Sequence, residues 1–490
     1  MREFAGRRIH FVGVGGASMR ALAEFCVEEG AKVSGSDKSP DGLPARLAET
    51  GAQVYVGSRT DIISAADVVV YSSAVPFDDP ELSAARAKGI PVVERQDFLA
   101  EIAGTFDVVA AVAGTHGKTT VTAMIAHVLK TCGIPFVAHI GGEPYGMSNL
   151  TVNRGTDGKI PHTLFLTEAC EYKRNLLALK PSLAVVTNME CDHPDCYANL
   201  NEVHSVFAKF VEKCPLTVLR EDDEFVCTNE HICIRKYPRY EKPEKDDERA
   251  TRNTDPQSVR NSSDGEDEPS YARKRICTYG VSRILECAEG QTIELACPDG
   301  RARSICLSQC GEHMATDAAL AVVAVCGLGV NTDDACAALL SFRGVKRRYE
   351  KAGKISGAYA VFDYAHHPTE IECTLRVAEK EGRLLVVFQP HTYSRTARYM
   401  GDFVRVLSQC DELVIMPTYA ARECGSDGAT ERELADAIAK EFPKNNVYLA
   451  VSHDDAWNYV KKHAPDFDVV LFLGAGDIYA LKDRIVPAVR

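Results

Sequence analysis

Apolar residues occur in short runs along the chain, separated by segments in which they recur with a helical period. Residues 1–105 show this rhythm first, with strand-like runs at 8–16, 31–37 and 65–73 and an amphipathic stretch at 18–30. Apolar runs of this length, alternating with helical patterns, are typical of βαβ units. The pattern therefore predicts that the chain opens with a parallel sheet.

The same alternation continues in two further blocks. The second has expected strands at 106–114, 163–169 and 182–189 and expected helices at 118–133 and 201–213. The third has expected strands at 359–368, 383–390, 411–420 and 468–477, each running into a polar loop. We expect an α/β protein in which ligands bind at the carboxyl ends of the strands.

One segment breaks the alternation. Residues 241–270 contain two apolar residues apart from proline, Ala250 and Val259, and fifteen charged ones. Such a composition buries too little surface to offset the entropy lost on ordering. We expect a mobile insertion on the central domain, either a solvated loop or a docking segment.

Charge and cysteine content narrow the class of protein. The formal net charge of -13 argues against a nucleic-acid-binding surface. The longest apolar run, 318–330, is too short to span a membrane, and the N-terminus lacks the apolar stretch of a signal peptide. The 18 cysteines are scattered without a C-x-x-C pair. These features favour a cytoplasmic protein with reduced thiols and no membrane contact.

The motif "AGTHGKTT" (113–120), here called the phosphate turn, joins an apolar strand to a helix. This order aims backbone N–H groups and a helix N-terminus at phosphate oxygens. Lys118 is expected to reach the β- and γ-phosphates, and the Thr119 hydroxyl a Mg²⁺ ion. The usual pattern has a glycine where Val112 stands, so an ordinary βα turn is the alternative.

A second motif, "GVGGAS" (13–18), here called the glycine turn, follows the first strand. Gly13 and Gly15 match the start of a dinucleotide-binding pattern, and Asp37 closes the next strand. Ser18 stands where the third glycine belongs. The turn therefore predicts either a dinucleotide site, a diphosphate site or a tight turn without a ligand.

Polar clusters follow two strands of the second block. Glu168 in "TEACEY" (167–172) has the oxygen ligands that Mg²⁺ prefers, and His193, beside Asp192, is a candidate for a second cation. A zinc site made of Cys191, His193 and Cys196 would need a fourth ligand. A structural turn capped by Asp192 is the remaining alternative.

Similar clusters follow the strands of the third block. The polar groups at these strand ends are Asp363, His366, His367, His391, Tyr393 and Arg395. Such side chains bind anions or metals or act as acid and base, although loops without a ligand also carry them. Ahead of the first of these strands, Arg347 and Arg348 are candidates to clamp an anion, with a solvated linker as the alternative.

Taken in order, the motifs GVGG, AGTHGKTT, TEACEY, TNMECDHPD, FRGVKRRYE, DYAHHPTEI, FQPHTYSRT, YAARE and GAGDI resemble those of the Mur ligases of peptidoglycan synthesis. The family's loop is the shorter G-T-x-G-K-T form, which assigns Val112 to the strand. The resemblance covers nearly the whole chain apart from about 220–275. "DYAHHPTEI" and "FQPHTYSRT" favour the branch acting on UDP-N-acetylmuramate and L-alanine over those adding D-glutamate, the third residue or a dipeptide.

The resemblance implies three domains: a Rossmann-like domain at 1–105 that binds the UDP part, a central domain with a phosphate-binding loop at 106–344 that binds ATP, and a Rossmann-like domain at 345–490 that binds the amino acid. It places ATP and its phosphates on Gly114, Thr115, His116, Gly117, Lys118, Thr119, Thr120, His313, Arg348 and Asp363. It places the UDP substrate on Gly13, Gly15, Gly16, Ser18, Asp37 and Ser73. His366, His391 and Arg395 are expected to face the amino acid and the intermediate. The metal ligands are expected to be Thr119, Glu168 and His193.

The resemblance also implies chemistry. ATP phosphorylates a carboxylate, and an amine attacks the acyl phosphate to release phosphate. Lys118, Glu168, His193, Arg348 and Asp363 are the expected catalytic residues, with Mg²⁺ as the cofactor. The expected partners are the small-molecule substrates alone, in a monomer or weak homodimer.

Three motifs depart from the common family pattern. Met314 and Asp317 stand where relatives carry asparagines, which puts the adenine contact in question except at His313. "EACEYK" (168–173) replaces E-A-D-E-S-D but keeps both glutamates. Arg20 replaces a serine and either meets a diphosphate or points to solvent. A nicotinamide-dependent dehydrogenase and a non-catalytic homologue remain as alternatives.

Overall fold

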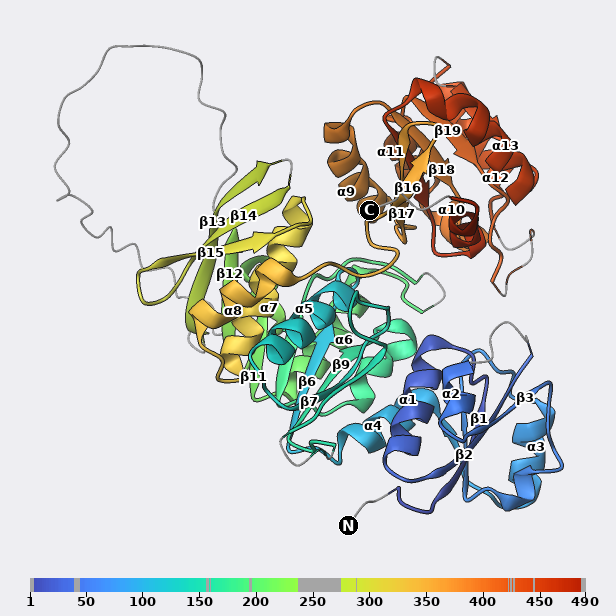
Figure 1. The fold of residues 1–490 in the computed structure, drawn as a ribbon, viewed down its shortest axis with the longest axis vertical. Helices are drawn as coiled ribbons and strands as arrows, with labels where there is room; N and C mark the ends of the chain where they lie inside the picture. The colour runs from blue at the N-terminus through green and yellow to red at the C-terminus, as the bar shows by residue number, and fades with distance from the viewer. Residues whose placement is uncertain are drawn as a thin grey trace.

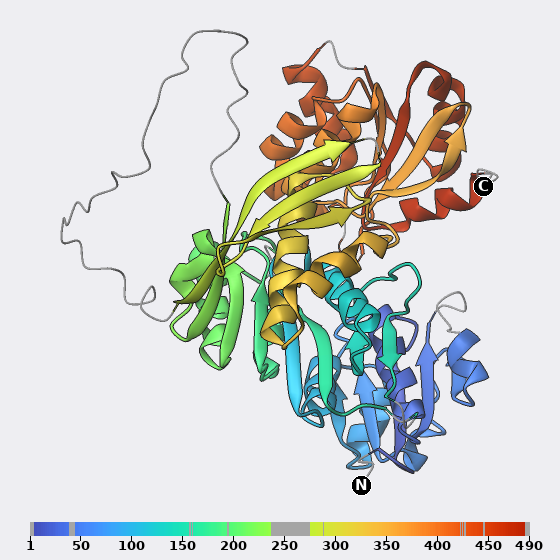
Figure 2. The ribbon, with the colours of Figure 1, turned by 60° about the vertical axis from the view of Figure 1, so that its left-hand side comes forward.

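The computed structural model describes residues 4–38, 45–155, 158, 160–193, 196–236, 275–287, 289–421, 423, 425, 428–443 and 446–485. It contains three α/β domains, each built around one sheet (Figure 1). The N-terminal and C-terminal domains each adjoin the central domain, as a second view confirms (Figure 2). The insertion expected at 241–270 lies outside the described residues.

The N-terminal domain has a fully parallel five-stranded sheet with the order β3-β2-β1-β4-β5. Its strands are β1 (Arg8–Val12), β2 (Lys32–Asp37), β3 (Gln53–Val56), β4 (Val68–Tyr71) and β5 (Val92–Glu94). Its helices are α1 (Ala17–Glu28), α2 (Ala45–Glu49), α3 (Pro80–Ala87) and α4 (Arg95–Ala103), with the short η2 (Ile63–Ala65). The run at 65–73 was predicted as the third strand and is in fact the fourth, because the short, half-exposed β3 was not recognised in the sequence.

The central domain has a ten-stranded sheet with the order β15-β14-β13-β12-β11-β10-β6-β9-β7-β8. Its strands are β6 (Val108–Ala113), β7 (Phe136–His139), β8 (Leu150–Asn153), β9 (Leu164–Ala169), β10 (Leu183–Val186), β11 (Leu216–Arg220), β12 (Glu230–Lys236), β13 (Arg275–Cys287), β14 (Gly290–Ala296) and β15 (Ala302–Leu307). Its helices are α5 (Lys118–Thr131), α6 (Leu200–Glu212), α7 (Glu312–Gly327) and α8 (Thr332–Ala338), with η3 (Tyr172–Ala178), η4 (Glu221–Val226) and η6 (Leu339–Ser341).

The C-terminal domain has a six-stranded sheet with the order β16-β17-β21-β18-β19-β20, parallel except for β16. Its strands are β16 (Glu350–Ile355), β17 (Ala358–Asp363), β18 (Leu384–Phe388), β19 (Glu412–Ile415), β20 (Asn446–Leu449) and β21 (Val469–Leu473). Its helices are α9 (Pro368–Ala378), α10 (Tyr393–Arg398), α11 (Met400–Leu407), α12 (Glu431–Glu441) and α13 (His453–His463), with η7 (Glu379–Glu381), η9 (Ala464–Asp466) and η10 (Asp477–Arg484).

The apolar cores join the domains unequally. One buried cluster runs from Phe25 of α1 to Phe207 of α6, so the N-terminal and central domains share a core. The C-terminal domain has its own two clusters, such as those around Val386 and Val387 on opposite faces of β18. Its contacts with the central domain include polar pairs such as Arg395–Asp192 and Thr369–Glu190. Polar interfaces of this kind are typical of domains that move relative to each other. No helix among the described residues has the length and apolar character needed to cross a membrane.

Candidate active site

The phosphate turn is shaped by two glycines between β6 and α5. Gly114 has a φ of 144°, and a Cβ there would lie 1.9 Å from the Thr187 hydroxyl oxygen. Gly117 has a φ of 81°, and a Cβ there would lie 2.9 Å from a carboxylate oxygen of Asp317. Side chains at either position would be strained and would clash. Val112 is fully buried in β6, as the shorter loop pattern requires.

Lys118 opens α5, and its ammonium group turns back over the phosphate turn. Nζ donates to the carbonyl oxygens of Gly114 at 2.5 Å and Thr115 at 2.9 Å. It also forms an ion pair with Glu171 at 2.8 Å, and Glu171 lies 3.2 Å from His193 Nε2. Burial alone would lower the pKa of Lys118, but the Glu171 carboxylate raises it above its usual value. Lys118 is therefore a partly buried, permanently charged group at the mouth of the turn.

Thr119 and Glu168 lie together beside that ammonium group. The Thr119 hydroxyl donates to a Glu168 carboxylate oxygen at 3.1 Å, and the Gly141 N–H donates to the other at 2.6 Å. Burial raises the pKa of Glu168. A hydroxyl and a desolvated carboxylate at one point form an oxygen donor set of the kind Mg²⁺ prefers. Within the described part of the chain, His193 bonds to neither Thr119 nor Glu168; it contacts Glu171, which in turn pairs with Lys118.

Arg348 and Asp363 approach the site from the C-terminal domain. The Asp363 carboxylate accepts N–H hydrogen bonds from Tyr349 and Ala365, both at 2.7 Å. Burial nevertheless raises its pKa to about 6. The Arg348 guanidinium lies 3.8 Å from a Glu370 carboxylate oxygen and 5.1 Å from the centre of the Tyr364 ring. Both residues are thus fixed at the junction between the domains.

The residues expected to face the amino acid form one cluster. The rings of His366 and His391 are 5.3 Å apart between centroids, and Arg395 Nη1 lies 3.1 Å from His391 Nδ1. Burial lowers the pKa of His366 to about 3 and that of His391 to about 4, which keeps both rings neutral. Arg395 also binds Asp192 of the central domain at 2.9 Å, with both side chains buried.

The nearby cysteines do not converge on His193. The Arg398 guanidinium lies 2.9 Å from Cys191 Sγ, whereas His193 Nε2 faces Glu171. The His193 backbone N–H donates to the Asp192 carboxylate at 2.7 Å. Asp192 therefore caps this turn and binds Arg395 at the same time.

The glycine turn of the N-terminal domain has a simpler environment. Gly13 has a φ of 81°, and the Gly15 N–H donates to the Asp37 carboxylate at 2.9 Å. The Ser18 hydroxyl lies 2.9 Å from His139 Nε2, in the central domain. Arg20 donates to Asn149 at 2.9 Å and lies 3.4 Å from Glu143. Arg20 thus joins two domains rather than pointing to solvent.

The two positions that depart from the family pattern lie on α7. Met314 is buried, and Asp317 is 7% exposed with its carboxylate against Gly117. Burial raises the pKa of Asp317 to about 7. Position 317 therefore supports the phosphate turn itself.

Sequence patterns understated three acidic residues. Glu171 bridges Lys118 and His193, while Glu370 lies 3.1 Å from His116 Nδ1. Glu190 lies 3.6 Å from His116 Nε2. Glu171 and Glu370 stand inside the motifs "TEACEY" and "DYAHHPTEI", which was the available signal.

Family models match three stretches of the chain. Residues 8–107 match the Mur ligase family catalytic domain, 112–325 the Mur ligase middle domain, and 347–476 the Mur ligase glutamate ligase domain. Together these stretches span most of the chain.

Individual relatives match over nearly their whole length. The UDP-N-acetylmuramate–L-alanine ligase of Clostridium perfringens is 34% identical over 483 residues, covering 96% of each chain. That of Rubrobacter xylanophilus is 35% identical over 482 residues, covering 96% of this chain and 97% of its own. The crystal structure of the UDP-N-acetylmuramate-alanine ligase of Thermotoga maritima has the same fold, with a TM-score of 0.74, 24% identity and 97% coverage of both chains. The protein therefore belongs to the Mur ligase family.

Proposed function

We propose that the protein joins L-alanine to the carboxylate of UDP-N-acetylmuramate while ATP is converted to ADP and phosphate. One observation carries the proposal: Lys118 of the phosphate turn, Glu168 and the His366–His391–Arg395 cluster gather where the central and C-terminal domains meet. The near-full-length similarity to ligases of that name supports the choice of substrates.

The chemistry proceeds in two steps. A carboxylate oxygen of UDP-N-acetylmuramate attacks the γ-phosphorus of ATP, and ADP leaves. The amine of L-alanine then attacks the acyl carbon, the nitrogen loses a proton, the C–O bond to phosphate breaks, and an amide and inorganic phosphate result. The first step brings anions together, so charge neutralisation is the main demand on the protein. Lys118 and Arg348 are partly buried cations available for it.

The metal ligands are part of the proposal. The Thr119 hydroxyl and the Glu168 carboxylate fit Mg²⁺ because both are oxygen donors and the carboxylate is desolvated. His193, which contacts Glu171, would hold a second Mg²⁺. When bound, Mg²⁺ would supply charge neutralisation to the transferring phosphoryl group.

We assign the remaining roles to the neighbouring loops. The glycine turn, with Asp37 and Ser73, binds the UDP part. His366, His391 and Arg395 hold the alanine carboxylate and the intermediate, because a buried guanidinium beside neutral imidazoles suits a small anion. We infer a cytoplasmic setting, since the described cysteines are all free thiols.

Domain closure completes the site. The C-terminal domain meets the central domain through pairs such as Arg395–Asp192 and Thr369–Glu190. Substrates bound on separate domains must come together for reaction, and opening is then needed for release.

A substrate-omission assay tests the proposal. Purified protein is incubated with Mg²⁺ and ATP, and phosphate release is measured with UDP-N-acetylmuramate and L-alanine added singly and together. We expect rapid release with both substrates and only background with either alone. ATP turnover independent of both would overturn the proposal, and no turnover would favour a non-catalytic homologue. Glycine and L-serine in place of L-alanine would define the amino-acid preference.

A further inference from the structure

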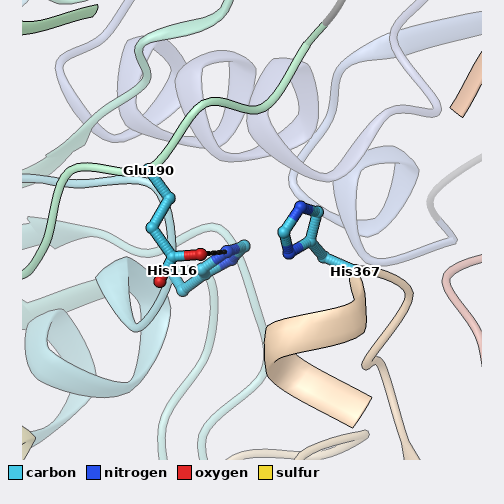
Figure 3. Close-up of side chains that lie close together, drawn as sticks. All are labelled: His116, Glu190 and His367. Carbon is cyan, nitrogen blue, oxygen red and sulfur yellow. Dashed lines mark ion pairs between the residues drawn. The ribbon is translucent and has the colours of Figure 1, made fainter. Parts of the chain in front are cut away.

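Three potential metal ligands meet beside the phosphate turn at the junction of two domains. His116 comes from the turn, Glu190 from the loop after β10, and His367 immediately precedes α9 of the C-terminal domain (Figure 3). One ligand atom of each residue lies within 4.8 Å of those of the other two. The rings of His116 and His367 are 5.0 Å apart between centroids.

The imidazole nitrogens of this group are only partly satisfied by the protein. Both ring nitrogens of His367 are buried and have no hydrogen-bond partner among the described residues, and His116 Nε2 has only a 3.6 Å ion pair with Glu190. His367 is only 5% exposed. Buried polar atoms are nearly always hydrogen-bonded, so unpartnered nitrogens at one point call for a ligand.

The surrounding contacts orient these side chains as they do in metal sites. His116 Nδ1 lies 3.1 Å from Glu370 Oε1, which directs Nε2 toward the group. The Thr369 hydroxyl donates to Glu190 Oε2 at 2.8 Å. Metal-binding histidines commonly bond a carboxylate through their other nitrogen, and ligating carboxylates are themselves hydrogen-bonded. Two carboxylates, Glu190 and Glu370, favour positive charge at this point and raise the pKa of His116 to about 10, so a bound metal ion would take the place of that proton.

We propose that His116, Glu190 and His367 bind a Zn²⁺ ion. Two imidazoles and one carboxylate are a known zinc donor set and leave a fourth position open. The tetrahedral ligand spacing is about 3.4 Å, so binding draws the three side chains slightly inward from their present separations. This site differs from the proposed Mg²⁺ site in both its residues and its nitrogen donors.

The ion would connect two domains that otherwise meet mainly through polar contacts. His116 and Glu190 belong to the central domain and His367 to the C-terminal domain. Bound zinc therefore holds the C-terminal domain closed on the phosphate turn. It opposes the opening needed for turnover, so zinc acts as an inhibitory latch.

A second group of possible ligands provides a contrast. Glu224, His231 and Cys233 also lie within 4.8 Å of one another. There, His231 Nδ1 is 2.8 Å from the Asn229 carbonyl oxygen, and Nε2 is 2.6 Å from Glu224. Arg275 already neutralises Glu224 at 2.7 Å. This histidine is fully partnered within the protein and needs no ion.

Cobalt titration tests the proposal, with Co²⁺ as a visible probe for Zn²⁺. The full-length protein is titrated without nucleotide or Mg²⁺, and competition with Zn²⁺ follows. We expect visible d–d absorption that saturates at one equivalent and is displaced by Zn²⁺. Because the chain has 18 cysteines, a near-ultraviolet thiolate-to-cobalt band is monitored as well. Saturation without that band assigns nitrogen and oxygen ligands.

Variants locate the site. His367→Gln and Glu190→Gln should each weaken cobalt binding at least about tenfold. His463→Gln, which alters another histidine–glutamate pair at 3.2 Å, should bind as the wild type does. Zn²⁺ should raise the Tm of the wild type but of neither site variant. Circular dichroism checks folding, and if His367→Gln is misfolded, Glu190→Gln decides. Unchanged binding in a folded site variant, a thiolate band, or no saturable binding would overturn the proposal.

Discussion

The glycine turn after β1 and the phosphate turn after β6 have the same architecture but different surroundings. Each joins a parallel strand to a helix through a glycine of positive φ, 81° at both Gly13 and Gly117. The glycine turn has one carboxylate, Asp37, bonded to its backbone. The phosphate turn is ringed by charged groups from four other segments, among them Glu171 and Glu370. The backbone of the glycine turn suits binding of an anion. The charged groups around the phosphate turn also suit it to phosphoryl transfer.

Removing the ammonium group of the phosphate turn should have the largest effect. We expect Lys118→Ala to lower kcat on the order of 10³-fold, because its charge lies over the phosphate turn itself, where the γ-phosphate is proposed to bind. Binding of UDP-N-acetylmuramate, measured by calorimetry, should stay nearly unchanged because the glycine turn is intact. Lys130→Ala is the control, since Lys130 lies on the same helix and donates to the Gly146 carbonyl oxygen at 3.2 Å. Loss of UDP-substrate binding in Lys118→Ala would show that the two turns are not separate sites.

Neutralising the carboxylate behind Lys118 should have the next largest effect. We expect Glu171→Gln to lower kcat about 10- to 100-fold, because it leaves the charge of Lys118 unpaired and frees His193. Since Glu171 raises the pKa of Lys118, the alkaline limb of the kcat profile should move to lower pH in the variant.

Glu171→Asp should restore part of both effects, because it returns the charge with a shorter side chain. A pH profile that matches the wild type would contradict this positioning role for Glu171.

The sequence pattern predicts some strands of the fold and misses others. Buried strands such as β6 and β18 were predicted because continuous apolar runs define them. The half-exposed β13 and the polar β16 were missed because their partners, rather than their composition, make them strands. Lys118, Thr119 and Glu168 were predicted as site residues because each stands in a short sequence motif, at 113–120 or 167–172.

No sequence motif predicted the contacts between the domains. His116 and Glu370 are 254 residues apart in sequence, and Asp192 and Arg395 are 203 apart. No local pattern specifies such a pair, because tertiary packing alone brings the two side chains together.

Weakening the anchor of the glycine turn should change substrate binding alone. Asp37→Asn loses a charge-assisted hydrogen bond to the Gly15 N–H, so we expect the KM for UDP-N-acetylmuramate to rise about tenfold. The KM for ATP and the kcat at saturation should stay within about twofold. Steady-state kinetics measure all three. Asp67→Asn, which breaks a surface pair with Arg8, is the matched control. A fall in kcat as large as that in Glu171→Gln would erase the distinction between the turns.

The smallest expected effect concerns the carboxylate that supports the phosphate turn. Burial raises the pKa of Asp317 to about 7 in the folded protein, against an ordinary value of 3.8 in the unfolded chain. Its contribution to stability is thus fully present below pH 3.8 and is lost as the pH rises through 7.

We therefore expect Asp317→Asn to raise the Tm at pH 8 by about 1–3 °C, with the gain shrinking toward pH 4. Differential scanning calorimetry across this pH range measures it. Asp402→Asn, on the exposed face of α11, should show no such trend. A gain that is larger at pH 4 than at pH 8 would have the wrong sign for a raised pKa.

Oxygen-isotope transfer tests the role of the phosphate turn most directly. UDP-N-acetylmuramate labelled with ¹⁸O in its carboxylate is converted to product with ATP and L-alanine, and the released phosphate is analysed by mass spectrometry. If the substrate carboxylate attacks the γ-phosphorus of ATP beside Lys118, each released phosphate carries one oxygen from the carboxylate and is therefore labelled. Phosphate released without label, alongside amide product, would contradict an acyl-phosphate mechanism.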